Sequence, residues 1–367
     1  MYYVFRSAIL AILAAASLGS IHLMRADLEF RRRTPEGVAR AVDLAPKNTE
    51  YLEFRALQLD YDGTDSTAML ERAAELNPMS AAPRIRLGLA AETRGDFSTA
   101  EKWLLDAARI DRQFEPRWTL ANYYFRRENN AQFWTWIRSA LEISYGDRRP
   151  AFDLCWRVSD DPREILTRAI PGRHEVIAAY LGYLLETHRA TGAVAMKLAS
   201  AHDPADRELL LAACDAMIAA HESTAARELW REMGFGEVSF DAPRVGHGFD
   251  WRRIESPGVV HLEIDQPRAM HRIAFNGKQP ESCELLRRVV SLEPGKRYTL
   301  RWEVQLQSIS GESGIDWRIG DQRARIEDRQ MQFTAASDLM TLTLAYSRPS
   351  GQVRAEGWIE LWSVEIQ

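Results

Sequence analysis

The sequence has few cysteines and no local motif for catalysis or metal binding. Its three cysteines, Cys155, Cys214 and Cys283, are far apart, which excludes a disulfide framework and a paired-cysteine metal site. The eight histidines are scattered without metal-ligand spacing, and the usual local motifs of hydrolases, nucleotide-binding proteins and zinc proteases are missing. We therefore expect no enzyme, with no catalytic residues, no metal and no cofactor. The alternative is a glycosidase whose two carboxylates are distant in sequence.

Long runs of one charge sign are also missing. A net charge of −5 without a basic tail argues against a nucleic-acid partner. The hydrophobic content of 46% supplies enough apolar surface for folded cores, which excludes a wholly disordered chain. A length of 367 residues fits two domains, or one domain and a repeat array.

The longest apolar run stands at the N-terminus. Residues 7–24 contain no Asp, Glu, Lys or Arg and come close to the length that crosses a bilayer. We predict a retained membrane anchor within residues 1–25, with a signal peptide cleaved near Ala16 as the alternative. Arg25 and the arginines at 31–33 follow this segment, and by themselves they favour a cytoplasmic body.

From the anchor to about residue 235 the chain repeats itself. The phrases AVDLAP, AAELNP, AARIDR and ALEISY end at Pro46, Pro78, Arg112 and Tyr145, and subtraction gives spacings of 32, 34 and 33. This is the tetratricopeptide (TPR) period. In the clearest copy, the small residues Gly88, Ala100 and Ala107 stand where two helices cross, since larger side chains would hold the backbones apart. Residues 26–235 are therefore predicted to form a TPR-like α-solenoid, with its last helical hairpins as a cap.

The concave groove of such a solenoid is the predicted binding surface for a partner protein. In the next copy, Trp118 is assigned to the first large aromatic position and Asn122 to a position where a small residue is usual. Positions that face the groove in TPR proteins then fall on the following residues: Ala82, Ile85, Leu89, Glu92, Thr93, Thr119, Tyr123, Arg126 and Arg127. Leu89 and Tyr123 stand where an asparagine would be needed to clamp a terminal carboxylate, which disfavours chaperone-tail binding. The alternative is that Tyr123 and Trp118 pack inside and that the two arginines form a solvated edge.

After Gly234 the hydrophobic period changes from helical to two. Alternating segments predict strands at 259–264, 269–275, 298–306, 315–319, 340–346 and 357–366. Residues 236–367 are therefore predicted to form an antiparallel β-sandwich or jelly roll, so that the fold class is α+β with several domains. The Pro294-Gly295 turn before a long strand and the closing strand 357–364 resemble the galactose-binding-like jelly rolls of carbohydrate-binding modules.

A sugar site would need exposed aromatic rings, and the tryptophans of this region are the candidates. Trp302 and Trp317 alternate in phase with apolar neighbours, which places them in the core. Trp251, Trp358 and Trp362 remain as a possible glycan platform. Packing inside the sandwich is the alternative for each of them.

The motifs FRRRTPE, PRWTLANYYFR, FDLCWRVS, GFDWR and GKQPESCELLRR, with the closing GWIEL strand, resemble bacterial membrane-anchored TPR proteins associated with exopolysaccharide synthesis and export. This resemblance implies a single-pass inner-membrane protein with a periplasmic body, against the indication of the arginines; a cytoplasmic body is the alternative. The expected function is a scaffold that binds proteins. A glycan-binding protein that acts through its β-sandwich is the second possibility.

Overall fold

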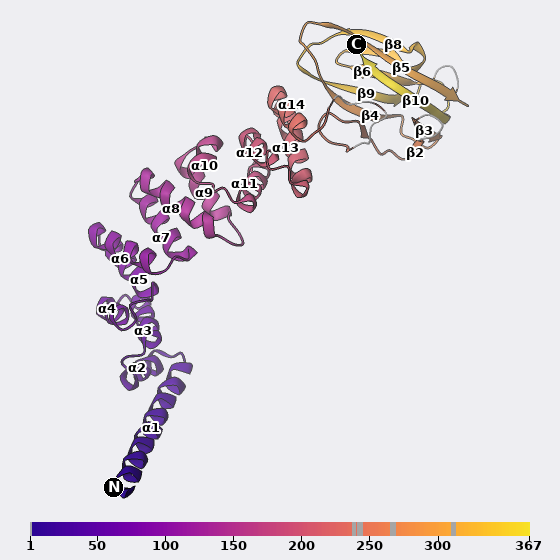
Figure 1. The fold of residues 1–367 in the computed structure, drawn as a ribbon. Coiled ribbons are helices and arrows are strands. Elements are labelled where there is room, and N and C mark those ends of the chain that lie inside the picture. The colour runs from indigo at the N-terminus through magenta and orange to yellow at the C-terminus, as the bar shows by residue number, and fades with distance from the viewer. Residues whose placement is uncertain (1, 237–239, 241–244, 265–268, 310–312) are drawn as a thin grey trace. The chain divides into compact units, whose positions relative to one another are not determined.

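The computed structural model describes residues 2–236, 240, 245–264, 269–309 and 313–367, and for residues 2–12 and 15 it describes the backbone alone. The chain divides into two compact units. Unit 1 comprises Met1–Ser159 with Thr167–Pro171, and unit 2 comprises Asp160–Leu166 with Gly172–Gln367. Figure 1 shows helices throughout unit 1, and helices followed by two sheets in unit 2. This arrangement confirms the predicted α+β class.

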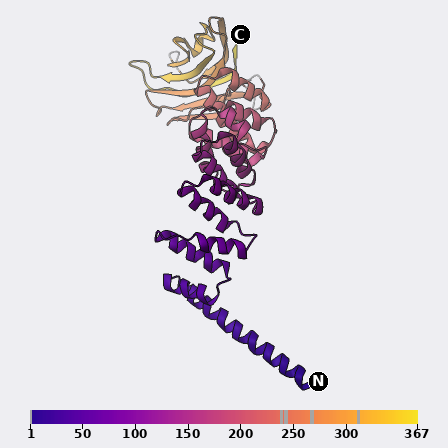
Figure 2. The ribbon, with the colours of Figure 1, turned by 90° about the vertical axis from the view of Figure 1, so that its left-hand side faces the viewer.

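Unit 1 is built from consecutive antiparallel helical hairpins, which follow one another in both views (Figures 1 and 2). Its helices are α1 (Tyr2–Arg31), α2 (Pro35–Leu44), α3 (Thr49–Tyr61), α4 (Thr67–Leu76), α5 (Ala82–Thr93), α6 (Phe97–Ile110), α7 (Phe114–Arg126), α8 (Asn130–Ile143) and α9 (Arg149–Val158). Helix α10 (Pro162–Arg168) lies at the division between the units. The predicted repeat array is therefore present as helix pairs.

Polar residues set the starts of these helices. The side chain of Asp96 accepts a hydrogen bond from the Thr99 backbone N–H at 3.1 Å, and Asn129 accepts one from Gln132 at 3.2 Å. Both satisfy a backbone donor that the first turn of a helix leaves without a partner. Asp161 accepts from the Arg163 backbone N–H at 2.8 Å, which matches the capping role that its place before Pro162 suggests.

Small residues allow the two helices of a hairpin to meet. Ala100 and Ala107 of α6 are fully buried, and Leu104 between them is 1% exposed. A Cβ atom added to Gly88 of α5 would lie only 2.7 Å from the Leu104 side chain. The predicted packing role of Gly88 is therefore confirmed.

The N-terminal helix α1 runs past the predicted anchor and joins the array. Ala26 and Phe30, near its end, are buried in a cluster with Val38, Ala41 and Tyr51. Among the described residues, no helix is both long and apolar enough to span a membrane. The predicted segment 7–24 lies partly outside them, because the side chains of residues 2–12 and 15 are not described.

Unit 2 begins with helices that pack on one another. They are α11 (His174–Glu186), α12 (Gly192–Ala199), a 3₁₀ turn η1 (Pro204–Asp206), α13 (Arg207–Ala219) and α14 (Ser223–Glu232). Asp215 of α13 receives hydrogen bonds from the segment that leads into the sheets: its Oδ2 lies 2.7 Å from His247 Nδ1, and its Oδ1 accepts from the Gly248 N–H at 2.7 Å and from Arg252. Trp230 of α14 lies against Gly248, where an added Cβ atom would be 2.5 Å from the indole ring.

Two antiparallel sheets follow, each with five strands in the described residues. The strands are β1 (Arg252–Arg253), β2 (Val259–Ile264), β3 (Met270–Asn276), β4 (Ser282–Ser291), β5 (Arg297–Gln307), β6 (Ile315–Ile319), β7 (Gln322–Arg325), β8 (Gln330–Thr334), β9 (Leu339–Ser347) and β10 (Glu356–Ile366), with a 3₁₀ turn η2 (Ile326–Asp328). The sheet orders are β1-β4-β9-β6-β7 and β2-β3-β10-β5-β8.

The two sheets bury a shared apolar core. Trp302 and Trp317 lie inside it, 4% and 0% exposed, and Trp302 donates its indole N–H to the Ile326 carbonyl at 2.6 Å. Their predicted core positions are confirmed. About eight short strands were predicted, and the six segments assigned to residues are all present, whereas β1, β4, β7 and β8 were not assigned to residues.

Candidate functional site

The structure aligns the α5–α6 and α7–α8 pairs with an offset of 33 residues. Asp96 and Asn129 cap equivalent helices, and Gly95 and Glu128 before them both have a positive φ, 80° and 54°. The fully buried Ala121 then matches Gly88. The predicted assignment put Asn122 at this position because Trp118 was used as the reference. The groove positions predicted for α7 are therefore displaced by one residue.

This displacement explains the location of Tyr123 and Arg127. Tyr123 is 3% exposed and donates a hydrogen bond to the Phe97 carbonyl at 2.9 Å. The Arg127 guanidinium lies 3.6 Å from the centre of the Phe97 ring. Burial, followed by the nearby carboxylates of Glu101 and Glu92, raises the pKa of Tyr123. Both residues thus contact the start of α6, and Tyr123 is a packing residue.

Glu92 and Arg126 form the main polar contact between α5 and α7. Arg126 Nε and Nη2 donate to the two carboxylate oxygens of Glu92 at 2.8 and 2.7 Å. The Glu92 side chain is 13% exposed and that of Arg126 is 44% exposed. Bidentate pairs of this kind add geometric specificity as well as interaction energy. The hydrogen bonds that Arg126 donates to Glu92 raise the pKa of Arg126, and the pair joins two consecutive repeats.

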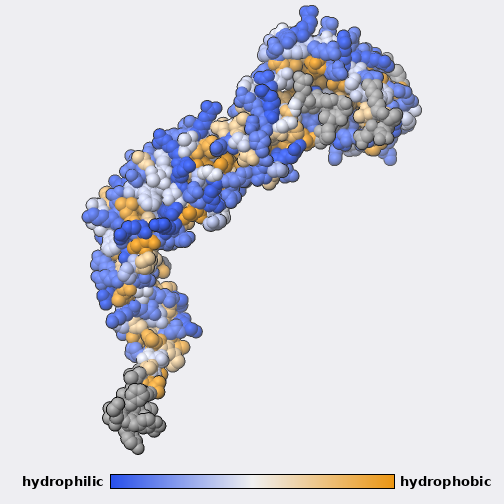
Figure 3. Space-filling view, in the orientation of Figure 1, coloured by the Kyte–Doolittle hydropathy of each residue, from blue (hydrophilic) through white to orange (hydrophobic). Residues whose placement is uncertain are grey.

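Three residues occupy equivalent positions beside the small residues of the first helices, and we call them the groove row. Leu57 follows Ala56 in α3, Leu89 follows Gly88 in α5, and Asn122 follows Ala121 in α7. Leu57 and Leu89 are 49% and 39% exposed, although leucine is a residue that usually lies inside. Figure 3 shows small hydrophobic patches among hydrophilic ones on the visible face of unit 1. The row offers one exposed leucine in each of two repeats.

The other predicted groove residues have mixed positions. Ile85 is 5% exposed and lies in a buried cluster with Ala81 and Ala107. Thr119 is half-buried, and its hydroxyl donates to the Glu115 carbonyl of its own helix at 2.9 Å. Ile85 therefore supports packing. Leu57 was not predicted, because groove positions were assigned only in the two clearest copies of the repeat.

The three predicted glycan-platform tryptophans have different environments. Trp251 is fully buried, where its ring contacts Phe240 and Trp317, so it presents no face to a ligand. Trp358 and Trp362 on β10 are half-buried. The Arg272 guanidinium lies 5.4 Å from the centre of the Trp358 ring. Of the three, only Trp358 and Trp362 retain surface that could contact a sugar.

Trp358 belongs to the outer face of its sheet. Glu360, two residues along β10, is 8% exposed and accepts hydrogen bonds from Arg272 Nε and Nη2 at 3.0 and 2.5 Å. On β2, at the edge of the same sheet, Val260 and Leu262 are 51% and 45% exposed. This face combines an indole ring, a paired guanidinium and apolar surface.

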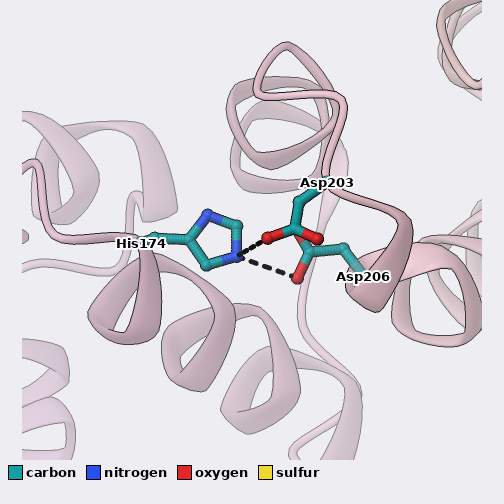
Figure 4. A group of neighbouring side chains, drawn as sticks. All are labelled: His174, Asp203 and Asp206. Atoms are coloured by element: carbon teal, nitrogen blue, oxygen red, sulfur yellow. Dashed lines mark hydrogen bonds and ion pairs between the residues drawn. The ribbon is translucent and has the colours of Figure 1, made fainter.

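One group of residues was missed by sequence reasoning. His174, at the start of α11, lies beside Asp203 and Asp206 (Figure 4). Its Nε2 atom is 3.1 Å from Asp206 Oδ1 and 3.7 Å from Asp203 Oδ2. The histidine is separated from Asp206 by 32 residues, so no short spacing pattern could reveal the group.

Comparison with known proteins supplies structural likenesses alone. No protein-family model matches the chain, and no curated protein matches it. A solved structure of YrrB, described as a TPR protein with an unusual peptide-binding site, matches with a TM-score of 0.29 and 12% identity over 55% of this chain and 92% of that one. A structure of Naa15/Naa10 bound to HypK-THB matches with a TM-score of 0.32 and 12% identity over 58% of this chain and 36% of that one.

Proposed function

We propose that the chain is a scaffold that binds a partner protein along the groove row of its helical hairpins. The observation that supports this most directly is the pair of exposed leucines, Leu57 and Leu89, at equivalent positions of consecutive repeats. A partner segment could bury one apolar side chain against each leucine. Full burial of a leucine side chain contributes about 1.5–3 kcal/mol, which suits a reversible interaction.

The polar neighbours of the row would supply orientation. Glu92 and Arg126 are already paired with each other, so a partner would meet a neutral pair with an exposed guanidinium edge. Asn122, half-buried, donates its amide N–H to the Trp118 carbonyl at 2.9 Å. Apolar anchors flanked by satisfied polar groups are typical of protein interfaces.

Paired substitution of the two leucines tests the proposal. Leu57→Glu with Leu89→Glu should abolish partner capture by the full-length protein from solubilised membranes. The matched control is Leu105→Glu on α6, because Leu105 is also 39% exposed but lies on the second helix of its hairpin. Capture that survives the double substitution, or that Leu105→Glu reduces equally, would contradict binding at the groove row.

The outer face of the sheet β2-β3-β10-β5-β8 supports glycan binding as a second candidate function. Its half-buried Trp358 and the Arg272–Glu360 pair could contact a sugar ring and its hydroxyls. Trp358→Ala and Trp362→Ala would then reduce polysaccharide retention in affinity electrophoresis. Trp136→Ala, which also removes a half-buried tryptophan but from α8, should leave retention unchanged. Equal retention by all variants would eliminate this candidate.

We also propose that residues 7–24 anchor the protein in the inner membrane and that its body lies in the periplasm, near polysaccharide export. The arginines after this segment favour the opposite topology, yet part of their charge is balanced: Arg31 pairs with Asp27 at 2.8 Å, and Arg32 with Glu29 at 3.1 Å. A reporter active only in the periplasm, fused after Gln367, tests the topology. If only a cytoplasmic reporter is active at that site, the body is cytoplasmic.

A further inference from the structure

We propose that His174, Asp203 and Asp206 bind one divalent transition-metal ion, with zinc as the best match. This group, which we call the His–Asp–Asp site, belongs to unit 2 and lies outside both surfaces discussed above. One ligand atom from each residue lies within 4.8 Å of the other two. An imidazole and two carboxylates form a mixed set that zinc accepts.

The local fold directs the three side chains to one point (Figure 4). His174 is the first residue of α11. Asp203 caps the 3₁₀ turn η1 between α12 and α13, and Asp206 is the last residue of that turn. One carboxylate oxygen of Asp203 accepts from the Ala205 backbone N–H at 2.9 Å, which holds its other oxygen toward His174. The turn thus fixes the orientation of a side chain that is otherwise 45% exposed.

The separations fit a metal site. Two ligands that bind zinc at about 2.0–2.2 Å in a tetrahedral arrangement lie about 3.3–3.6 Å apart. The His174 Nε2 atom is 3.1 Å from one carboxylate and 3.7 Å from the other. Small side-chain movements would bring both distances into the tetrahedral range. A solvent molecule would complete the coordination, because His174 is 38% exposed.

A second observation concerns Asp206, whose side chain is only 7% exposed. Its Oδ2 atom is buried and has no hydrogen-bond partner. A buried carboxylate oxygen without a donor is costly, and a cation is the partner that offsets this cost best. The adjacent Arg207 does not supply it, since its guanidinium lies over the Phe235 ring at 4.8 Å. A metal ion that the Asp206 carboxylate binds through both of its oxygens would supply it.

The proposal is tested by zinc titration of the full-length protein after chelator treatment. Calorimetry should show one zinc per chain, and Co²⁺ should give a visible absorption band that zinc abolishes. His174→Ala, Asp203→Asn and Asp206→Asn should each weaken binding at least about tenfold, since even outer-sphere changes at metal sites cost about 10–100-fold. A thermal shift caused by zinc should disappear in the same variants.

The matched control is His247→Gln. His247 forms another histidine–carboxylate contact, with Asp215 at 2.7 Å, and it should not affect zinc affinity. If buried Asp206→Asn does not fold, the exposed positions His174 and Asp203 still decide the outcome. Absence of binding at millimolar zinc, or binding that His174→Ala and Asp203→Asn leave unchanged, would overturn the proposal and leave a simple ion pair.

Discussion

Replacing Gly88 by alanine tests the close approach of α5 to α6. The new Cβ atom would lie 2.7 Å from Leu104 Cγ and Cδ2 and 3.2 Å from the Ala100 carbonyl oxygen. Leu104 is 1% exposed, so its side chain has little room to move away. Gly182 in α11 is the matched control, because an added Cβ atom there would have no neighbour within 4 Å.

The two substitutions should change local stability in opposite directions. Alanine is about 1 kcal/mol more favourable than glycine inside a helix. At Gly182 this gain stands alone, so Gly182→Ala should stabilise α11 by about 0.5–1 kcal/mol. At Gly88 the same gain is opposed by overpacking, which costs about 1–3 kcal/mol. Gly88→Ala should therefore destabilise the α5–α6 hairpin by about 1 kcal/mol.

Hydrogen exchange measured by mass spectrometry on the full chain resolves the two sites separately. Peptides from α5 and α6 should exchange faster in Gly88→Ala, and peptides from α11 should exchange more slowly in Gly182→Ala. If Gly88→Ala protects its hairpin as much as Gly182→Ala protects α11, the inferred contact with Leu104 is wrong.

Three further predictions concern buried polar groups. Arg84 is 8% exposed and donates to Asp106 at 2.7 Å. Because Asp106 is 28% exposed and keeps Arg109 as a partner, Arg84→Ala should destabilise the repeats by about 1.5–3 kcal/mol in urea denaturation, whereas loss of the exposed Arg109 partner should cost far less. Burial raises the pKa of Asp106, but hydrogen bonds from Arg109 and Arg84 outweigh burial and hold the pKa below its ordinary value. The stabilisation of the fold by ionised Asp106 is therefore present above about pH 4 and is lost as the pH falls through the lowered pKa. This pH dependence of the unfolding free energy should flatten in Asp106→Asn. Burial, followed by the Asp215 charge, raises the pKa of Cys214 to about 12, and burial likewise raises the pKa of Cys155. A thiol reagent at neutral pH should therefore modify the half-buried Cys283 first. It should modify Cys214 and Cys155 only after denaturation.

Sequence periodicity predicted the main elements because it reflects which side of each element is buried. The spacing of Ala100, Leu104 and Ala107 corresponds to one face of α6, and the alternation around Trp302 corresponds to the two faces of β5. The register between repeats was harder to assign. Trp118 was a misleading reference, whereas the capping residues Asp96 and Asn129 carry the correct offset.

Long-range packing accounts for what could not be predicted. Trp251 stands in a loop-like sequence context, but its burial depends on contacts with Phe240 and Trp317. Phe240 precedes the first strand, and Trp317 lies in β6, far along the sequence. The His–Asp–Asp site likewise needs the α12–α13 turn to return to the start of α11. Neither the contacts of Trp251 nor the His–Asp–Asp site leaves a local sequence pattern, because the path of the chain between the residues brings them together.

The hydrogen bonds to Asp215 have a practical consequence for dividing the protein. A fragment that begins at residue 236 would keep His247, Gly248 and Arg252 but lose the carboxylate that accepts from all three, and it would uncover the surface that Trp230 covers at Gly248. The natural limit for a transplantable C-terminal module therefore lies near Gly172, where the longer of the two segments of unit 2 begins. Fusions, truncations and domain exchanges made there would carry the last helices together with the sheets.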